Sequence, residues 1–526
     1  MARMQYLLRS SRKEVWGLLG LGVVVAFGMA WMIQGGDARL AIAGALVTVL
    51  GGLVVISPRV AIVVTFIFLT VLGDFRRALV PLTGWPSEDP LLLVGPAVAI
   101  LLVGCVVAVQ QLRLSTHLSR WILLLMLLMA LQVVNPGQGS LFVGMAGALF
   151  YVVPLLWFWI GRSYATPQSV AFLLYRVVVP LAVLAALLGV YQAFFGLLPF
   201  QQHWADRFGY AALNVGGYIR PISFFTSAAE YAFFVIVALV LLWASWLKRA
   251  RGSRIGGLVL IPLLALALFL ISSRGVVVMG LFTAALLWAV QARSPTVWFV
   301  RLVLASALGV AVLVLVLPHL QSVYPTGRVG ALVAHQASGF LDPLNPEVST
   351  LREHVSIFLG GFAEGLAHPL GQGLGVTTLA TYKYGSTAST VTMESTSTEV
   401  DLSNVFVSLG VVGGAVYIVI VALALLSALR YWHVSRTLVA LAILGVLVVQ
   451  SGQWLTGSHY ALSALTWFCI GALDKFQESR RSGDENRYRN TQGNQGRRAG
   501  TRELRGSVVS SSSRASGGLG GQRNSF

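Results

Sequence analysis

The chain has 526 residues, of which 56% are hydrophobic and only 11% are charged. Soluble globular domains carry about 25% charged residues, so this composition excludes a soluble fold and predicts a polytopic membrane protein. The formal net charge of +18 does not indicate a nucleic-acid partner, because the cations fall in short loops and in the stretch 474–526, where eleven Lys and Arg face five Asp and Glu.

The first apolar run begins at Val15, after a cluster of basic residues at positions 3 to 13. Such a cluster also opens secretory signals, but no polar domain follows this run. We therefore expect the run to remain as the first membrane span.

Further apolar runs follow along most of the chain, and each is long enough to cross a bilayer core of about 30 Å as a helix. The sequence therefore predicts an all-α fold in which residues 1–473 form a domain of about 14 transmembrane helices. The predicted spans are 15–34, 39–57, 60–73, 91–111, 121–134, 142–161, 177–196, 228–247, 255–272, 275–291, 298–317, 404–427, 437–456 and 459–473.

Basic residues fall in alternate links between these spans, and the densest cluster is "KRARGSR" at 248–254. Because Lys and Arg concentrate on the cytoplasmic side, this pattern predicts that both termini lie in the cytoplasm. The stretch 474–526 is rich in Ser, Gly and Arg, and it is predicted to be a disordered basic cytoplasmic tail.

Two of the links predicted to be exterior are long, 197–227 and 318–403. A connection of about 85 residues is a functional candidate rather than a simple link. Within it, Val355, Leu359, Phe362 and Leu366 share one helical face. That spacing predicts a helix lying on the membrane surface.

Three arginines fall in exterior links, where cations are expected to be scarce: Arg220, Arg274 and Arg352. A guanidinium group is a planar fork of donors that matches a diphosphate. The sequence therefore favours a site for an anionic, lipid-linked substrate, if the fold brings the three together. The alternative is that each side chain reaches separately to phospholipid head groups.

Four stretches occur in the order and spacing of known signatures: "RPISFFTSAAEYA", "LISSRGVV", "REHVSIFLGGFAEGLAHPLGQGLGV" and "VDLSNVFVSLGVVGGAVYIVIV". On these stretches, residues 200 to 425 resemble the O-antigen ligase and O-antigen polymerase-like family. The resemblance implies a membrane glycosyltransferase in which Arg220, Arg274 and Arg352 hold the diphosphate of an undecaprenyl-diphosphate-linked oligosaccharide. Where much of that family has His before Asn, this chain has Ser403 before Asn404.

The reaction needs a base for the attacking sugar hydroxyl, and Asp401 is the nearest ionisable residue to the missing histidine. Glu399, His354 and His368 are the further candidates. The alternative for Asp401 is a solvated or helix-capping acid. Glu399 and Asp401 could also hold a divalent cation, but the arginines already supply the positive charge, so we expect no metal and no cofactor.

Two residues are predicted to orient the site. Glu230 is the only acid inside a predicted span, and it lies ten residues after Arg220. An acid in a membrane span is a functional candidate by default, although a structural ion pair is an equal alternative. Asn404, from the family's last motif, is the second.

These residues together predict a polymerase that extends an exported polysaccharide at the outer face of the inner membrane. A ligase that transfers the glycan to a lipid or protein acceptor is the first alternative, and a polysaccharide transporter or flippase is the second. All acids except Glu230 lie outside the predicted spans, which counts against ion-coupled transport. A peptidoglycan-type polymerase is a third alternative. The expected partners are the lipid-linked oligosaccharide, membrane lipids and other polysaccharide export and chain-length proteins.

Overall fold

The computed structural model describes residues 38–86, 88–108, 114–208, 214–215, 217–250, 253–323, 326–378, 380–384, 400–455 and 459–480. The chain separates into two compact units, one ending at Lys475 and one beginning at Phe476. All of the architecture below belongs to the first unit, except residues 476–480 at the end of the last helix.

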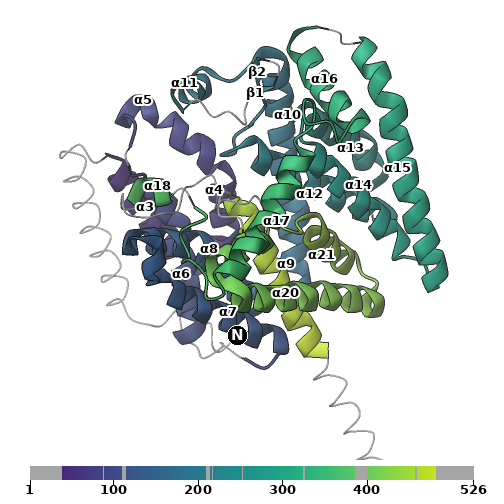
Figure 1. Ribbon diagram of the computed structural model, residues 1–526. Coiled ribbons are helices and arrows are strands. Elements are labelled where there is room, and N and C mark those ends of the chain that lie inside the picture. The colour runs from purple at the N-terminus through teal and green to yellow at the C-terminus, as the bar shows by residue number, and fades with distance from the viewer. Residues whose placement is uncertain are drawn as a thin grey trace, which may run out of the picture. The chain divides into compact units, whose positions relative to one another are not determined.

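The first part of this unit is a series of helices joined by short links (Figure 1). In chain order its elements are α3 (Ala38–Ile56), α4 (Pro58–Ala78), α5 (Val80–Thr83), the 3₁₀ helix η1 (Pro90–Leu93), α6 (Val94–Ala108), α7 (His117–Val133), the 3₁₀ helix η2 (Pro136–Gln138), α8 (Leu141–Tyr164), α9 (Pro167–Phe172), the π-helical turn η3 (Leu173–Val178), α10 (Val179–Phe195) and α11 (Pro199–Phe208).

A two-residue hairpin and a second series of helices follow. The elements are β1 (Asn214–Val215), β2 (Tyr218–Ile219), α12 (Ala228–Leu247), α13 (Ser253–Leu270), α14 (Arg274–Ala289), α15 (Pro295–Val323), α16 (Gly327–Leu341), α17 (Leu351–Ala367), α18 (Ala380–Tyr384), α20 (Asp401–Ser435), α21 (Leu438–Val449) and a last helix over 460–480. Figure 1 shows α15 along one edge of the bundle with α16 beside its end, and α3, α6 and α8 on the opposite side.

Eight of the described helices are long and apolar enough to cross a membrane: α3, α4, η1 with α6, α8, α9 through α10, α12, α15 and α20. Helices also occupy every other predicted span except the first, which lies outside the described residues. The helical, polytopic character predicted from composition is therefore confirmed.

Proline and short polar side chains determine where several helices begin. Pro58 starts α4 one residue after α3 ends, because a proline lacks the N–H that a helix interior needs and is tolerated in the first turn. Thr116 and Thr166 begin α7 and α9 with reciprocal hydrogen bonds to the serine three residues later. These caps satisfy the free N–H groups of the first turn.

Glycines allow α8 and the last helix to cross at close range. A Cβ added at Gly161 would lie 2.1 Å from the carbonyl oxygen of Phe468, and one added at Gly471 would lie 2.0 Å from that of Phe158. Each helix therefore presents a glycine to the backbone of the other, which is the small-residue packing typical of helices in membranes.

The helix α20 is interrupted at Gly410, whose φ of 68° and ψ of −167° are not helical. The loop that follows α17 bonds to the backbone groups released there. The N–H groups of Gln372 and Gly373 donate to the carbonyls of Val407 and Ser408 at 3.1 and 3.2 Å, and Val411 N–H donates to Pro369 O at 3.2 Å.

The region 318–403 begins inside α15, which runs six residues beyond its predicted end, and then forms α16, α17 and α18. The predicted helix with Val355, Leu359 and Leu366 on one face is α17, and these three side chains are exposed. The other side of α17 packs on α20 through Gly365, and Phe362, the fourth residue predicted on the apolar face, contacts Phe406 of α20. A helix with an exposed apolar face is thus confirmed at this position.

Candidate functional site

Arg274 is the first residue of α14 and follows a tight turn in which Ser272 has a left-handed φ of 60°. Its Nη1 donates to the carbonyl of Val348 at 2.9 Å, and its Nη2 lies 3.2 Å from Nε2 of His335. Neither partner is an anion. In the described part of the chain no carboxylate forms an ion pair with Arg274.

A glycine in α16 makes room for this guanidinium group. A Cβ added at Gly339 would lie only 1.0 Å from Nη1 of Arg274, and no rotamer of a larger residue removes a Cβ. Gly339 is one helical turn after His335, so both residues lie on the same face of α16. This face therefore provides both the contact and the space for the Arg274 side chain.

The imidazole of His335 is neutral at pH 7. Burial, together with the positive charges of Arg274 and Arg220, lowers its pKa to about 4. A guanidinium group only donates, so Nε2 accepts from Arg274 and the imidazole proton is on Nδ1. His335 is thus a neutral side chain that lies close to two permanent cations.

Arg220 reaches the same turn from the segment before α12. Its Nη1 donates to the carbonyl of Ser272 at 3.2 Å, two residues from Arg274. The structure therefore brings together two of the three arginines predicted from the sequence, with His335 near both.

The segment 220–227 that carries Arg220 is held by polar side chains that include one from α10 and one from α4. Gln192 Oε1 accepts from the N–H groups of Ile222 and Ser223 at 3.0 and 2.7 Å. Arg77 of α4 donates to the carbonyls of Phe225 and Thr226 at 2.7 and 2.8 Å. Ser223 has a φ of 51°, so these bonds stabilise a backbone turn that a non-glycine residue rarely adopts.

Glu230 contributes to the same segment rather than to an arginine contact of its own. Its Oε2 accepts from the hydroxyl of Thr226 at 2.5 Å and from the Thr226 N–H at 3.1 Å. Glu230 therefore affects Arg220 only indirectly, by stabilising the turn that precedes α12.

Arg352, the third predicted arginine, is an exposed residue in the first turn of α17. It lies four residues after Val348, whose carbonyl accepts from Arg274. The segment between these residues is therefore short, but no described hydrogen bond joins Arg352 to the other two arginines.

Asp401, the predicted base, is only 1% exposed. Its Oδ2 accepts from the N–H of Leu455 at 2.7 Å and from the hydroxyl of Tyr417 at 3.3 Å. The carboxylate is buried rather than solvated, and it ties the start of α20 to the link after α21. A buried acceptor with these partners has the environment of a structural group.

His354 and His368, two further predicted bases, lie at opposite ends of α17. His354 is exposed in the first turn of α17 and contacts Thr350 at 3.1 Å. His368 follows the last turn, where its Nδ1 lies 3.2 Å from Glu364. The two are about 20 Å apart along the helix, since α-helices rise 1.5 Å per residue. Glu399 lies outside the described residues, and Asn404 is a buried residue in the first turn of α20.

Sequence reasoning missed His335 and Gly339. Both lie between the predicted span 298–317 and the predicted surface helix, where no family signature was recognised. The available signal was a histidine and a glycine four residues apart, which places them on one helical face. Without knowledge of which helix faces α14, that spacing does not point to a site.

Comparison with known protein families and with curated proteins finds no match for this chain.

The arrangement of Arg220, Arg274 and His335 can bind an anion. Two permanent cations converge on one turn, and the imidazole between them adds no positive charge at neutral pH. Arg274 uses only two of its five donors within the described residues. The remaining donors are available for the oxygens of a phosphate or carboxylate.

Proposed function

We propose that this protein is a membrane glycosyltransferase that transfers or polymerises an undecaprenyl-diphosphate-linked glycan at the outer face of the bacterial inner membrane. In this proposal the chain crosses the membrane about 14 times, with both termini in the cytoplasm. The turn that holds Arg220 and Arg274 then lies at the exterior end of α12, α13 and α14.

The observation that supports the proposal is the pair of contacts of Arg274. A guanidinium group whose described partners are a carbonyl and a neutral imidazole keeps its full charge for a ligand. Structural arginines inside membrane proteins are expected to pair with acids, as Arg77 pairs with Asp74 at 3.1 Å. A diphosphate carries the negative charge that this site lacks, and its oxygens match the planar donors of a guanidinium group.

In the reaction, an oxygen of the acceptor sugar forms a bond to the anomeric carbon of the donor glycan. The bond from that carbon to the diphosphate oxygen breaks, and its electron pair stays on the leaving diphosphate. Arg220 and Arg274 stabilise this developing negative charge more strongly than the ground state. Fixed guanidinium donors thus lower the barrier without a metal ion.

The proton of the attacking hydroxyl needs an acceptor, and His335 has the best position among the described residues. Its Nε2 lone pair accepts from Arg274 here and is released when the guanidinium group turns to the diphosphate. The bound anion also offsets the two positive charges that lower the pKa of His335, so the imidazole becomes a stronger base when the donor is bound. This assignment replaces Asp401 as the proposed base.

The direct test supplies lipid-linked repeat units to the purified full-length protein in nanodiscs and separates the products on a gel. A ladder of products supports polymerisation, and a single shift on a distinct acceptor supports ligation. Movement of the lipid across the bilayer with no glycosidic product would instead identify a flippase and overturn the proposal.

A second experiment tests whether His335 is the base. His335→Ala removes the proton acceptor, so product formation should fall by about 100-fold, which is within the range expected for general-base catalysis. Free imidazole added at millimolar concentration should restore part of the rate. His354→Ala is the matched control and should keep the wild-type rate. Loss of product formation in His354→Ala, together with full activity in His335→Ala, would show that His335 is not the base.

A further inference from the structure

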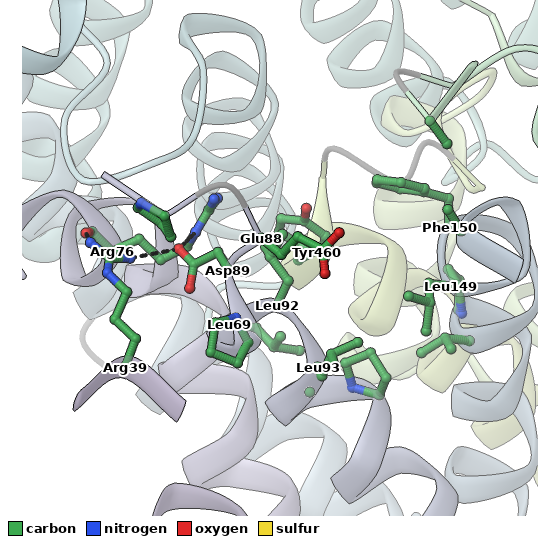
Figure 2. A pocket seen from close by; sticks show the side chains of 18 of the residues that line it. Arg39, Leu69, Arg76, Glu88, Asp89, Leu92, Leu93, Leu149, Phe150 and Tyr460 are labelled. Carbon is green, nitrogen blue, oxygen red and sulfur yellow. Dashed lines mark hydrogen bonds and ion pairs between the residues drawn. The ribbon is translucent and has the colours of Figure 1, made fainter. Parts of the chain in front are cut away.

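A cavity of about 940 Å³ lies between the early helices and the start of the last helix (Figure 2). Its walls come from α3, α4, η1, α6 and α8, with α18 and the start of the last helix completing it. Ligand pockets for small molecules have volumes of about 300 to 1,000 Å³, so this cavity can hold a whole head group and part of a chain.

One side of the cavity is apolar. Side chains from three elements form this wall, namely Leu69, Leu92, Leu93, Leu149, Val153 and Trp157. In Figure 2 the labelled leucines lie to the right of Arg39 and Arg76, away from the two guanidinium groups. A ligand that fits both sides is an amphiphile.

The polar side contains two arginines that share one carboxylate. Arg39 is 6% exposed, and it donates to Asp89 at 2.8 Å, to Thr83 at 2.7 Å and to the carbonyl of Arg76 at 2.9 Å. Its three nitrogen atoms are thus all bonded within the protein. Arg39 therefore stabilises the wall of the cavity, and it is not expected to bind a ligand.

Arg76 differs from Arg39 in this respect. Only its Nε donates to Asp89, at 2.6 Å, and its side chain is 30% exposed. Its two terminal amino groups form no hydrogen bond with a described residue. Because Asp89 faces two guanidinium groups, one positive charge at Arg76 is left over for a bound anion.

A carboxylate lines the same cavity as this cation. Glu88 precedes Asp89 in the chain, lines the same cavity and is exposed. Its Oε1 accepts from the hydroxyl of Tyr384 at 2.9 Å, and Tyr384 belongs to α18 on the facing side. The cavity therefore offers one cation and one anion on neighbouring parts of its polar side.

We propose that this cavity binds a phospholipid whose head group carries both a phosphate and a primary ammonium. The phosphate accepts from the terminal amino groups of Arg76, and the ammonium donates to Glu88. The lipid chain follows the wall of Leu69, Leu93 and Leu149. An anionic lipid without an amine meets the charge of Glu88, and a quaternary ammonium has no N–H to donate, so both fit less well.

This site is separate from the proposed glycan transfer, because it shares no residue with the turn that holds Arg220 and Arg274. The experiment uses the full-length protein, delipidated in detergent, and native mass spectrometry. Phosphatidylethanolamine, phosphatidylcholine and phosphatidylglycerol with the same acyl chains are added in turn. We expect phosphatidylethanolamine to bind at least fivefold more tightly than either of the others.

Two charge variants assign the head group. Arg76→Gln should weaken all three lipids, and Glu88→Gln should remove the preference for the primary amine while leaving binding of the other two lipids unchanged or stronger. Arg120→Gln, an exposed arginine that does not line the cavity, is the control and should change nothing. A preference for phosphatidylglycerol that survives in Glu88→Gln would overturn the proposal.

Two variants of α8 test whether the lipid occupies the cavity. Ala146 lines it and Ala148, on the same helix, does not. Ala146→Trp should abolish the fivefold preference, whereas Ala148→Trp should keep it, and thermal unfolding checks that both are folded. Equal binding of phosphatidylethanolamine to both variants would show that the lipid binds to the protein surface and not in the cavity, and it would overturn the proposal. Glycerophosphoethanolamine has the same head group but no acyl chains. If it binds as tightly as phosphatidylethanolamine, the apolar wall does not contribute to binding and the ligand is not a lipid.

Discussion

The molecule contains two arginine clusters that differ in what faces the guanidinium groups. Arg39 and Arg76 share the carboxylate of Asp89, which is 4% exposed. Arg274 has a carbonyl and a neutral imidazole as its described partners, and Arg220 donates to a carbonyl of the same turn. The first cluster includes its own counter-charge, whereas neither described partner of Arg274 is an anion. Residue type alone therefore does not separate a structural arginine from a binding arginine, whereas the charge of the partner does.

The largest effect is expected from a substitution in the first cluster, which contains Arg39, Arg76 and Asp89. Asp89→Asn leaves two guanidinium groups without an anion in a largely enclosed position, and the free energy of unfolding should fall by about 3 kcal/mol. Thermal unfolding of the purified protein measures this change. Glu88→Gln is the control, and because Glu88 is exposed, it should change stability by less than about 0.5 kcal/mol. Similar stability of the two variants would contradict a structural role for the first cluster.

The second prediction addresses the charge of the other cluster. Arg220→Lys and Arg274→Lys should each lower product formation by about 100-fold, because an ammonium group cannot make a bidentate contact with a diphosphate. Unfolding temperatures should stay close to the wild-type value. The measurement is the gel assay with lipid-linked repeat units, and normal product from both variants would remove the diphosphate-binding role.

The third prediction tests the geometry of the second cluster without touching its charges. Gly339→Ala places a methyl group where Nη1 of Arg274 lies, so the guanidinium group must move and activity should fall by roughly tenfold. The matched control is Gly360→Ala in α17, where an added Cβ meets nothing within 4 Å. Equal rates for the two variants would show that the position of Arg274 is not needed for the reaction.

The smallest expected effect concerns pH. The pKa of His335 is lowered to about 4, so between the ordinary value of 6.5 and about 4 the unfolded chain binds a proton that the folded protein does not. Stability contributed by the neutral imidazole is thus complete above pH 6.5 and falls as the pH is lowered through this range. His335→Asn should lose less stability between pH 7 and pH 5 than the wild type, as measured by thermal unfolding. An identical pH dependence would contradict the low pKa.

Hydropathy was sufficient to place most of the helices, because each apolar run of about 20 residues is a strong and local signal. The break in α20 was not predicted, since a Gly-x-x-Gly run such as that after Gly410 reads as continuous apolar helix. The bonds that stabilise the break come from residues 369–373, and a local pattern does not show contacts between segments so far apart in the chain.

The site was predicted in part. Arg220 and Arg274 were selected because cations are rare in such links, and the structure places them at one turn. Asp401 was selected because it is the ionisable residue nearest to Ser403, which stands where the family has histidine, but its carboxylate is buried and accepts from Leu455, 54 residues away in the chain. His335 depends on the packing of α16 against α14. Residues defined by charge were thus predictable, and residues defined by tertiary neighbours were not.

The interruption of α20 has a mechanical consequence. The loop after α17 bonds to the helix on both sides of Gly410, through Val407 and Ser408 before it and through Val411 after it. Both parts of α20 are therefore tied to the residues that follow α17. Since α17 begins three residues after the carbonyl that accepts from Arg274, this one helix connects the Arg274 contact to the interruption in α20.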